Sequence, residues 1–450
     1  MNWGVAFFIA AANTALALGG YLAWPSRWNI PTLLGVSFCL TAFWIPMFSS
    51  MGYNSPSEQI TNLYVLLMCI AIPGFIIGIF LGKTLYRGFG FRNLEASRPL
   101  EFDWLVIGKV CRKTAFLLVI GLGGMALSFY LMGYVPMFAA DPMAAKFFKG
   151  EYQHSYSKVA LLHRTAWQFI TFAMPVGLYL GFLYRRAGVL ALSIVSILCM
   201  ALTLSRTSTL LGLLTALGLI AARQRSTFFA YFIFLVLMMP LGSASFYIID
   251  QIFPHSGFGF SNGDSLADQI AQGAPDVNDQ LSLLDSFQAS QEWTYGRTFV
   301  GALVPYNFRW NPAVWALTTV SGSPDVSNTN SGGYRLPVSL WGYVAFGYTG
   351  AFFVPLLSGL IAGWWGALMY QHVDGTRPVQ TILWISLYST LGNQMIQYYL
   401  LSIYSLPSIV CALFLLMGTK VRYLGAHHSA TTTLPKLPPQ KLPQPIGANS

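Results

Sequence analysis

Three arginines lie among aromatic residues in the only long polar interval of the sequence, between Trp293 and Gly350. The residues concerned are Arg297, Arg309 and Arg335, with the aromatic residues Tyr295, Tyr306 and Trp310 beside them. A planar guanidinium binds phosphate oxygens in pairs, and an aromatic ring stacks on a sugar face or lies at a lipid headgroup boundary. The pattern therefore suits the binding of a phosphate-linked glycan, and it suits a plain interfacial hairpin equally well.

A fourth arginine, Arg206, stands between two apolar runs, with the hydroxyl residues Ser205 and Thr207 on either side of it. Holding a guanidinium near the hydrocarbon boundary is costly, about 2.5–3.5 kcal/mol at the bilayer centre and less near its edge. Backbone amides at the start of the following helix would favour an anion at this position. We therefore expect Arg206 to bind an anion, and the alternative is an arginine that extends to the interface.

The segment 135–165 separates two apolar runs. Its basic residues are Lys146, Lys149, Lys158 and Arg164. We take Lys146, Lys149 and Arg164 as further candidates for substrate binding, because they would present one basic face to an anionic glycan.

The candidates for a general base are weaker. His154 and His163 could take a proton from a sugar hydroxyl, but we expect both to be solvated loop residues. Asp141 precedes Pro142, so its carboxylate is expected to cap a helix over MAAKFF and not to act in catalysis. Glu292 and Asp325 are the other candidates, and no motif surrounds either of them.

The composition places most of the chain in lipid. Hydrophobic residues make up 55% of the 450 and charged residues 9%, whereas a soluble domain has roughly 25% charged residues. Apolar runs of about 20 residues recur, and each can cross a hydrocarbon core of about 30 Å. We predict an all-α, polytopic transmembrane bundle of about eleven spans. They are placed at 3–24, 31–48, 63–82, 115–134, 166–184, 189–204, 207–222, 228–248, 341–370, 379–398 and 404–419.

The positions of lysine and arginine set the predicted orientation. The basic residues of the loop 83–114, of the short turns and of the tail fall on one side if the N-terminus is outside and the C-terminus inside. The predicted parts are an N-terminal bundle (1–248, with the outer loop 135–165), a large outer loop (249–340), C-terminal helices (341–424) and a disordered tail (425–450). The net charge of +10 is spread over these loops, so it does not indicate nucleic acid as a partner.

Within the large loop, 264–293 has the spacing of one or two short amphipathic helices, broken around 273–275. The stretch 321–333 is rich in Ser, Asn and Gly and is expected to be a mobile flap. The run 341–370 is longer than one crossing requires, so it is either tilted or begins as an interfacial segment.

Several function classes lack their sequence signals. No Gly-rich phosphate loop opens a helix, and the five cysteines are not at metal-ligand spacing. Few charged residues fall inside the predicted spans, which argues against an ion-coupled transporter. We therefore expect neither a nucleotide-driven pump nor a metalloprotease, and no metal or cofactor.

Three short stretches resemble the bacterial oligosaccharide repeat-unit polymerases, the Wzy-type O-antigen polymerases. GYVPMF at 133–138 is similar to the motif that opens the first outer loop of that family, and LSRT at 204–207 is similar to its "SR-S/T" turn. The run from Tyr295 through WNP at 310–312 to YVAFGYTG at 343–350 resembles its "iPR…wP…nFG..G" pattern. Two departures are present: Tyr306 follows the motif proline, where an arginine is common, and no acidic residue precedes the FG pair.

The resemblance implies a C-type glycosyltransferase (GT-C) fold in a bacterial inner membrane, with the active loops in the periplasm. It implies that the chain transfers a growing glycan from polyprenyl pyrophosphate to an incoming lipid-linked repeat unit, without a metal. Its partners would be the lipid-linked oligosaccharide, the bilayer and a chain-length regulator in the membrane. An O-antigen ligase, or a flippase or exporter of lipid-linked sugars, are the alternatives.

Overall fold

The computed structural model describes residues 57–88, 104–223, 276–304, 309–326, 338–373 and 406–417, with a few shorter pieces between them. In these residues the secondary structure is helical, and they contain no strand. The prediction of an all-α chain is therefore confirmed for the described part.

Four of the described helices are long and apolar enough to cross a membrane, by length and composition. They are α4 (Glu58–Gly88), α5 (Trp104–Met132), α8 (Ala160–Leu183) and α16 (Val338–Val373). Shorter apolar helices are α9 (Ala187–Leu202), α18 (Leu406–Leu416) and most of α10 (Arg206–Arg223). The predicted spans at 3–24, 31–48, 228–248 and 379–398 lie wholly or mostly outside the described residues, so the count of eleven and the orientation stay predictions.

Apolar side chains on the outside of these helices indicate a lipid environment. On α5, Phe116 and Val119 are each 54% exposed, and Tyr130 is 82% exposed. Large apolar side chains exposed along a helix are unfavourable in water, whereas hydrocarbon solvates them without cost. The chain is accordingly an α-helical membrane protein.

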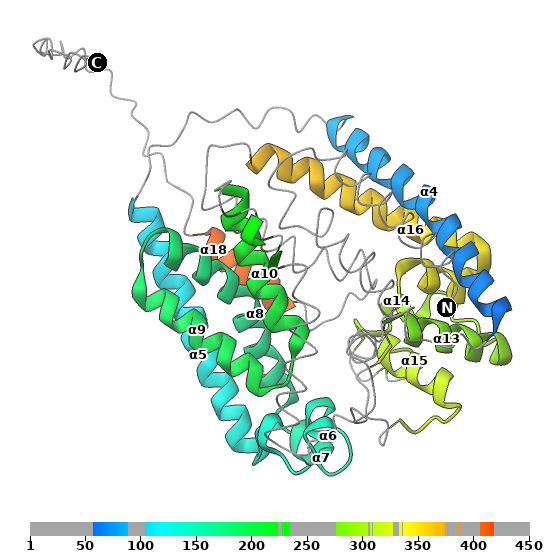
Figure 1. Cartoon of the computed structure of the whole chain (residues 1–450), viewed down its shortest axis with the longest axis horizontal. Helices are drawn as coiled ribbons and strands as arrows, with labels where there is room; N and C mark the ends of the chain where they lie inside the picture. The colour runs from blue at the N-terminus through cyan, green and yellow to red at the C-terminus, as the bar shows by residue number, and fades with distance from the viewer. Residues whose placement is uncertain are drawn as a thin grey trace, which may run out of the picture. The chain divides into compact units, whose positions relative to one another are not determined.

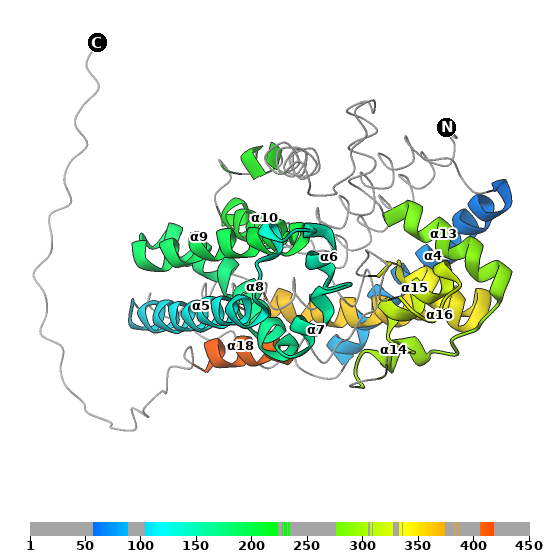
Figure 2. The ribbon, with the colours of Figure 1, turned by 90° about the horizontal axis from the view of Figure 1, so that it is seen from below.

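Helices α4 and α16 lie side by side along most of their length, as both ribbon views show (Figures 1 and 2). Glycines permit this close approach. A Cβ on Gly78 would overlap the carbonyl oxygen of Leu356, and one on Gly363 would overlap that of Ile79. In lipid, where no hydrophobic force drives two helices together, small residues that let backbones meet provide the van der Waals contact.

The second group of helices is arranged around α8, which packs against α5, α9, α10 and α18. Ile170 and Phe172 of α8 are fully buried in this core. Polar contacts add to the packing: the Ser408 hydroxyl of α18 donates to Gln168 Oε1 of α8 at 2.6 Å, and Lys113 Nζ of α5 donates to the Phe414 carbonyl at 2.7 Å.

The predicted loop over 83–114 is too long. Helix α4 continues to Gly88 and α5 begins at Trp104, so Lys83 and Lys109 are helical residues. The helices continue beyond their apolar runs because a lysine or arginine can lay its aliphatic stem along the helix and keep its charge in water.

Helix α16 is broken near its start. Phe346 (φ −143°, ψ 20°) and Gly347 (φ 67°, ψ −151°) are not helical, and the values at Gly347 belong to a region that is essentially restricted to glycine. The residues before and after the break meet, because a Cβ on Gly342 or on Gly350 would overlap the carbonyl oxygen of the other. The predicted span 341–370 therefore begins with a separate short limb.

Three short helices of the large loop pack near this break: α13 (Asp276–Ser290), α14 (Arg297–Gly301) and α15 (Pro312–Ser321). Leu284 and Phe287 of α13 are buried with Trp315 of α15 and Trp341 of α16. Helix α13 begins directly after the predicted break at 273–275, so the amphipathic helix is confirmed for the part that the structure describes. Residues 249–275 lie outside it, as does the tail 425–450.

The glycine contact between α4 and α16 yields a stability prediction. Gly78→Ala places a methyl group against the Leu356 carbonyl, and we expect a loss of about 1–3 kcal/mol, typical of overpacking. Gly123→Ala in α5 is the matched control, because no atom lies within 4 Å of its Cβ position. Thermal unfolding of the two variants in one detergent is the measurement. Equal midpoints would show that the glycine does not hold the helices together.

Candidate functional site

The loop before α14 is fixed to the short limb of α16. The Thr294 amide donates to the Val344 carbonyl at 3.0 Å. Tyr295 (φ 47°) and Gly296 (φ 78°) then turn the chain through the left-handed region, and a Cβ on Gly296 would lie 3.1 Å from the Phe346 ring. The turn therefore sets the first residue of α14, Arg297, beside the break in α16.

A second glycine brings α14 against the chain segment that enters α15. A Cβ on Gly301 would overlap the Trp310 carbonyl oxygen, so only glycine permits this contact. Asn311 then caps α15, its Oδ1 accepting from the Ala313 amide at 3.0 Å, and Pro312 occupies the first helical position. The WNP stretch at 310–312 thus has a structural role: Trp310 contacts α14, and Asn311 and Pro312 begin α15.

These contacts place two of the predicted arginines on one aromatic ring. The Arg297 guanidinium carbon lies 4.9 Å from the centroid of the Trp310 ring, and that of Arg309 lies 5.2 Å from the same ring system. Both distances are within the range of a cation–π contact. Both arginine side chains are exposed, so their remaining N–H donors face solvent or a ligand. We call Arg297, Arg309 and Trp310 the Trp310 site.

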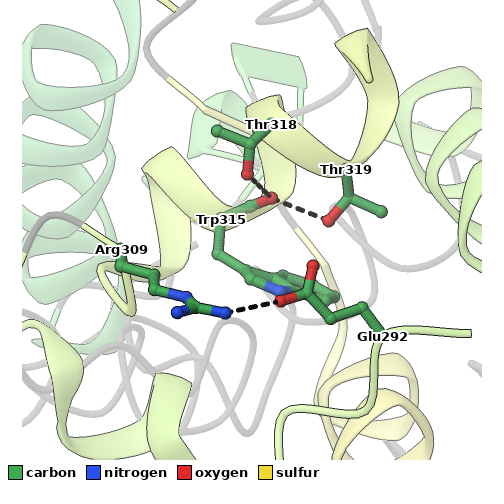
Figure 3. A network of polar contacts seen from close by, with 5 residues as sticks. All are labelled: Glu292, Arg309, Trp315, Thr318 and Thr319. Atoms are coloured by element: carbon green, nitrogen blue, oxygen red, sulfur yellow. Dashed lines mark hydrogen bonds and ion pairs between the residues drawn. The ribbon is translucent and has the colours of Figure 1, made fainter. Parts of the chain in front are cut away.

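One carboxylate lies at the edge of the Trp310 site. Arg309 Nη2 is 3.4 Å from Glu292 Oε1, and the two side chains are 75% and 52% exposed. Figure 3 shows this pair beside α15, where Thr318 and Thr319 donate to the Trp315 carbonyl at 2.9 and 2.8 Å. An ion pair so exposed contributes about 0–1 kcal/mol, which leaves Arg309 free to exchange partners at little cost.

Apolar side chains stand exposed next to the arginines. Val300 is 55% exposed, Leu303 42% and Val304 51%. They lie three to seven positions after Arg297 in the sequence. Tyr295, predicted to bind substrate, is 66% exposed. We call Val300, Leu303 and Val304 the α14 rim. The sequence analysis did not select these residues, although the apolar stretch VGALV within a polar interval is a visible signal.

Arg206 is the first residue of α10, as predicted for a residue between two helices. Leu204, two residues before Arg206, is 3% exposed and has φ 57°. A bulky residue in this region is strained, and the position after a helix is normally glycine. The backbone is thus held in a costly conformation directly before Ser205 and Arg206. The side chains of Arg206 and Thr207 lie outside the described residues.

Each of the other predicted binding residues contacts a different partner. Lys149 Nζ donates to the Val326 carbonyl at 2.7 Å, and Arg164 Nε donates to the Tyr156 hydroxyl at 2.6 Å. Lys146 lies over the neighbouring Phe147 ring, 4.9 Å from its centroid. Burial lowers the pKa of Lys149, although Asp325 acts in the opposite sense. Each of the three cations thus has a contact within the protein, and their part in substrate binding stays a prediction. Arg335 and Tyr306 lie outside the described residues.

The candidate bases differ in exposure and in their hydrogen-bond partners. His154 is exposed, as expected. Asp141 caps α6 (Pro142–Phe147), its Oδ1 accepting from the Ala144 amide at 2.9 Å, so the capping prediction is confirmed. The expectation that His163 is solvated is wrong: its side chain is fully buried, because α8 begins at Ala160 and includes it. Asp325 is exposed on a turn.

That turn belongs to the predicted flap. In residues 321–326 the side chains of Ser321 and Ser323 accept from nearby backbone amides, which orders the turn locally. Residues 327–332 of the flap lie outside the described residues. Within the described part of the chain, no group of three or more His, Cys, Asp or Glu side chains could hold a metal ion.

Comparison with known proteins gave no match, whether the chain was compared with models of protein families, with curated proteins or with solved structures.

Proposed function

We propose that the chain is a metal-independent glycosyltransferase that polymerises lipid-linked oligosaccharide repeat units at the outer face of a bacterial inner membrane. It would transfer a growing glycan from polyprenyl pyrophosphate to the next lipid-linked unit, to build O-antigen or another surface polysaccharide. One observation carries the proposal: two exposed guanidiniums share the Trp310 ring, beside the exposed apolar α14 rim.

The geometry of the Trp310 site suits a lipid-linked diphosphate. Each guanidinium has N–H groups in a planar fork that can bind two phosphate oxygens. The Trp310 indole keeps both guanidiniums beside one ring and leaves their positive charges unneutralised. Val300, Leu303 and Val304 supply the apolar surface that an isoprenoid chain would need next to its headgroup.

The proposed chemistry is electrostatic. The acceptor hydroxyl attacks the anomeric carbon, the bond to the pyrophosphate oxygen breaks, and the leaving group departs with the electron pair as its negative charge grows. Guanidiniums already in position stabilise that charge more in the transition state than in the ground state. Arg206, at the start of α10, and Arg335 would contribute to the same task.

The reaction itself separates this function from its alternatives. Purified protein supplied with lipid-linked repeat units is expected to yield a ladder of glycan lengths in detergent. A flippase or exporter would yield no ladder, and a ligase would need a lipid A core acceptor. In cells, loss of a polymerase leaves a core with a single repeat, whereas loss of a ligase leaves bare core.

The first prediction concerns the Trp310 site. The double change Arg297→Ala and Arg309→Ala is expected to slow ladder formation by about 100-fold or more, as the loss of preorganised donors does elsewhere. Arg112→Ala is the matched control, because Arg112 is an exposed arginine on α5. If the double variant polymerised as fast as the control, the Trp310 site would have no part in the reaction.

A second prediction concerns Glu292, which competes with an anionic ligand for Arg309. Glu292→Gln is expected to lower the KM for the lipid-linked donor by up to about fivefold, the equivalent of about 1 kcal/mol. Thermal stability should stay the same, because the ion pair is exposed. The effect should shrink as salt is added, since exposed charges are screened. A raised KM would instead indicate that Glu292 itself binds the donor.

A third prediction concerns Arg206. Arg206→Ala is expected to abolish polymerisation while the protein still inserts into the membrane, and Arg206→Lys should also be impaired because an ammonium lacks the paired geometry. The measurement is the chain-length distribution together with the amount of protein in membrane fractions. Wild-type chain lengths from Arg206→Ala would remove this residue from the site.

A further inference from the structure

The most unusual polar side chain in the described residues is the imidazole of His163. It lies near the start of α8 with an exposed fraction of 0%. Four aromatic rings surround it, with centroids 5.3–6.0 Å from that of the imidazole. We call these four residues the His163 cage: Phe129, Phe148, Tyr156 and Trp167.

Contacts with Ser128 of α5 determine which ring nitrogen bears the proton. The Ser128 hydroxyl donates to the Met125 carbonyl at 2.8 Å, and its oxygen lies 3.1 Å from His163 Nδ1. A hydroxyl has a single hydrogen. Both contacts are hydrogen bonds only if Nδ1 carries the proton and donates to the Ser128 oxygen. His163 Nε2 then carries the lone pair.

That lone pair has no partner. Nε2 is buried and without a hydrogen bond among the described residues. An acceptor left unpaired in a dry interior destabilises the fold, and few buried polar atoms in proteins are left so. Burial also disfavours the charged imidazolium. The fold thus maintains a neutral imidazole with a fixed tautomer and an unused basic nitrogen.

Two rings of the cage belong to the segment that precedes α8, and we call these two rings the lid. Phe148 ends α6 and Tyr156 lies in α7 (Tyr152–Ser157), and their rings stack at 3.6 Å with an interplanar angle of 8°. Arg164 Nε holds the Tyr156 hydroxyl at 2.6 Å. Phe148 has φ 55°, a strained value for a residue with a side chain. One of the rings that cover His163 is thus carried by the residue that ends α6.

We propose that His163 is the general base of the reaction and that Phe148 and Tyr156 cover it between turnovers. The inference rests on the proposed function. When the lid opens, the acceptor sugar hydroxyl reaches Nε2. The hydroxyl oxygen bonds to the anomeric carbon, its proton passes to Nε2, and the pyrophosphate leaves with the electron pair of the broken bond. Ser128 is a positioning residue, because it fixes the tautomer and touches no substrate.

Lid opening can be measured without the reaction. The hydrogen on the carbon between the two imidazole nitrogens exchanges slowly with deuterium, and mass spectrometry follows it for each histidine. In the purified full-length protein, His163 should exchange more slowly than the exposed His154. Phe148→Gly removes one of the two lid rings and accommodates a positive φ, so it should speed exchange at His163 toward the rate of His154. Equal rates for His154 and His163 in the wild type would contradict a lid.

The base role is tested by substitution. His163→Gln retains an acceptor but cannot take the proton, and it should polymerise at least about 100-fold more slowly, with partial rescue by added imidazole. His163→Phe removes the unpaired nitrogen, so it should be at least as heat-stable as the wild type and equally inactive. A rate within about twofold of the wild type in either variant would overturn the base role. No ladder from the wild type would remove the proposed function and this inference together, whereas a ladder that both variants retain would overturn the inference alone.

Discussion

The break at Phe346 and Gly347 connects the membrane helices to the candidate site. Beyond it, α16 packs along α4 through glycine contacts, and before it, the short limb is buried among α13, α14 and α15, with Leu340 and Val344 fully covered. One continuous segment thus belongs to both the spanning pair and the site that carries Arg297. Because a change of direction in a helix frees backbone groups, the Val344 carbonyl is available to the Thr294 amide, which fixes the α14 turn.

Glycine governs this region because backbones meet there. Gly342 and Gly350 let the two limbs of α16 approach each other, and Gly301 lets α14 reach Trp310. The glycines in the stretch GYVAFGYTG at 342–350 therefore have a physical basis: two permit contact and one, Gly347, adopts dihedral angles that other residues avoid. Without that contact and turn, the indole and the two guanidiniums that it gathers would not be held at the end of a membrane helix.

Sequence reasoning predicted the helices with strong apolar runs, the cap at Asp141 and the start of α10 at Arg206, because each depends on local pattern. It missed the burial of His163, because α8 extends beyond its apolar run and because rings from α5, α7, α8 and the end of α6 surround the imidazole. It also could not give the partner of Lys149, because the Val326 carbonyl belongs to a segment 177 residues further along the chain. The meeting of Arg297 and Arg309 on Trp310 depends on Gly301 and could not be read from spacing alone.

The central claim is that the Trp310 site binds a lipid-linked diphosphate. Native mass spectrometry of the purified protein can compare a polyprenyl diphosphate with the monophosphate of the same chain length, which supplies equal apolar area but half the phosphate. If this claim is correct, the protein retains the diphosphate more strongly than the monophosphate, and the preference is lost when Trp310 is replaced by Leu. Equal retention of the two lipids, or a preference that survives Trp310→Leu, would contradict it.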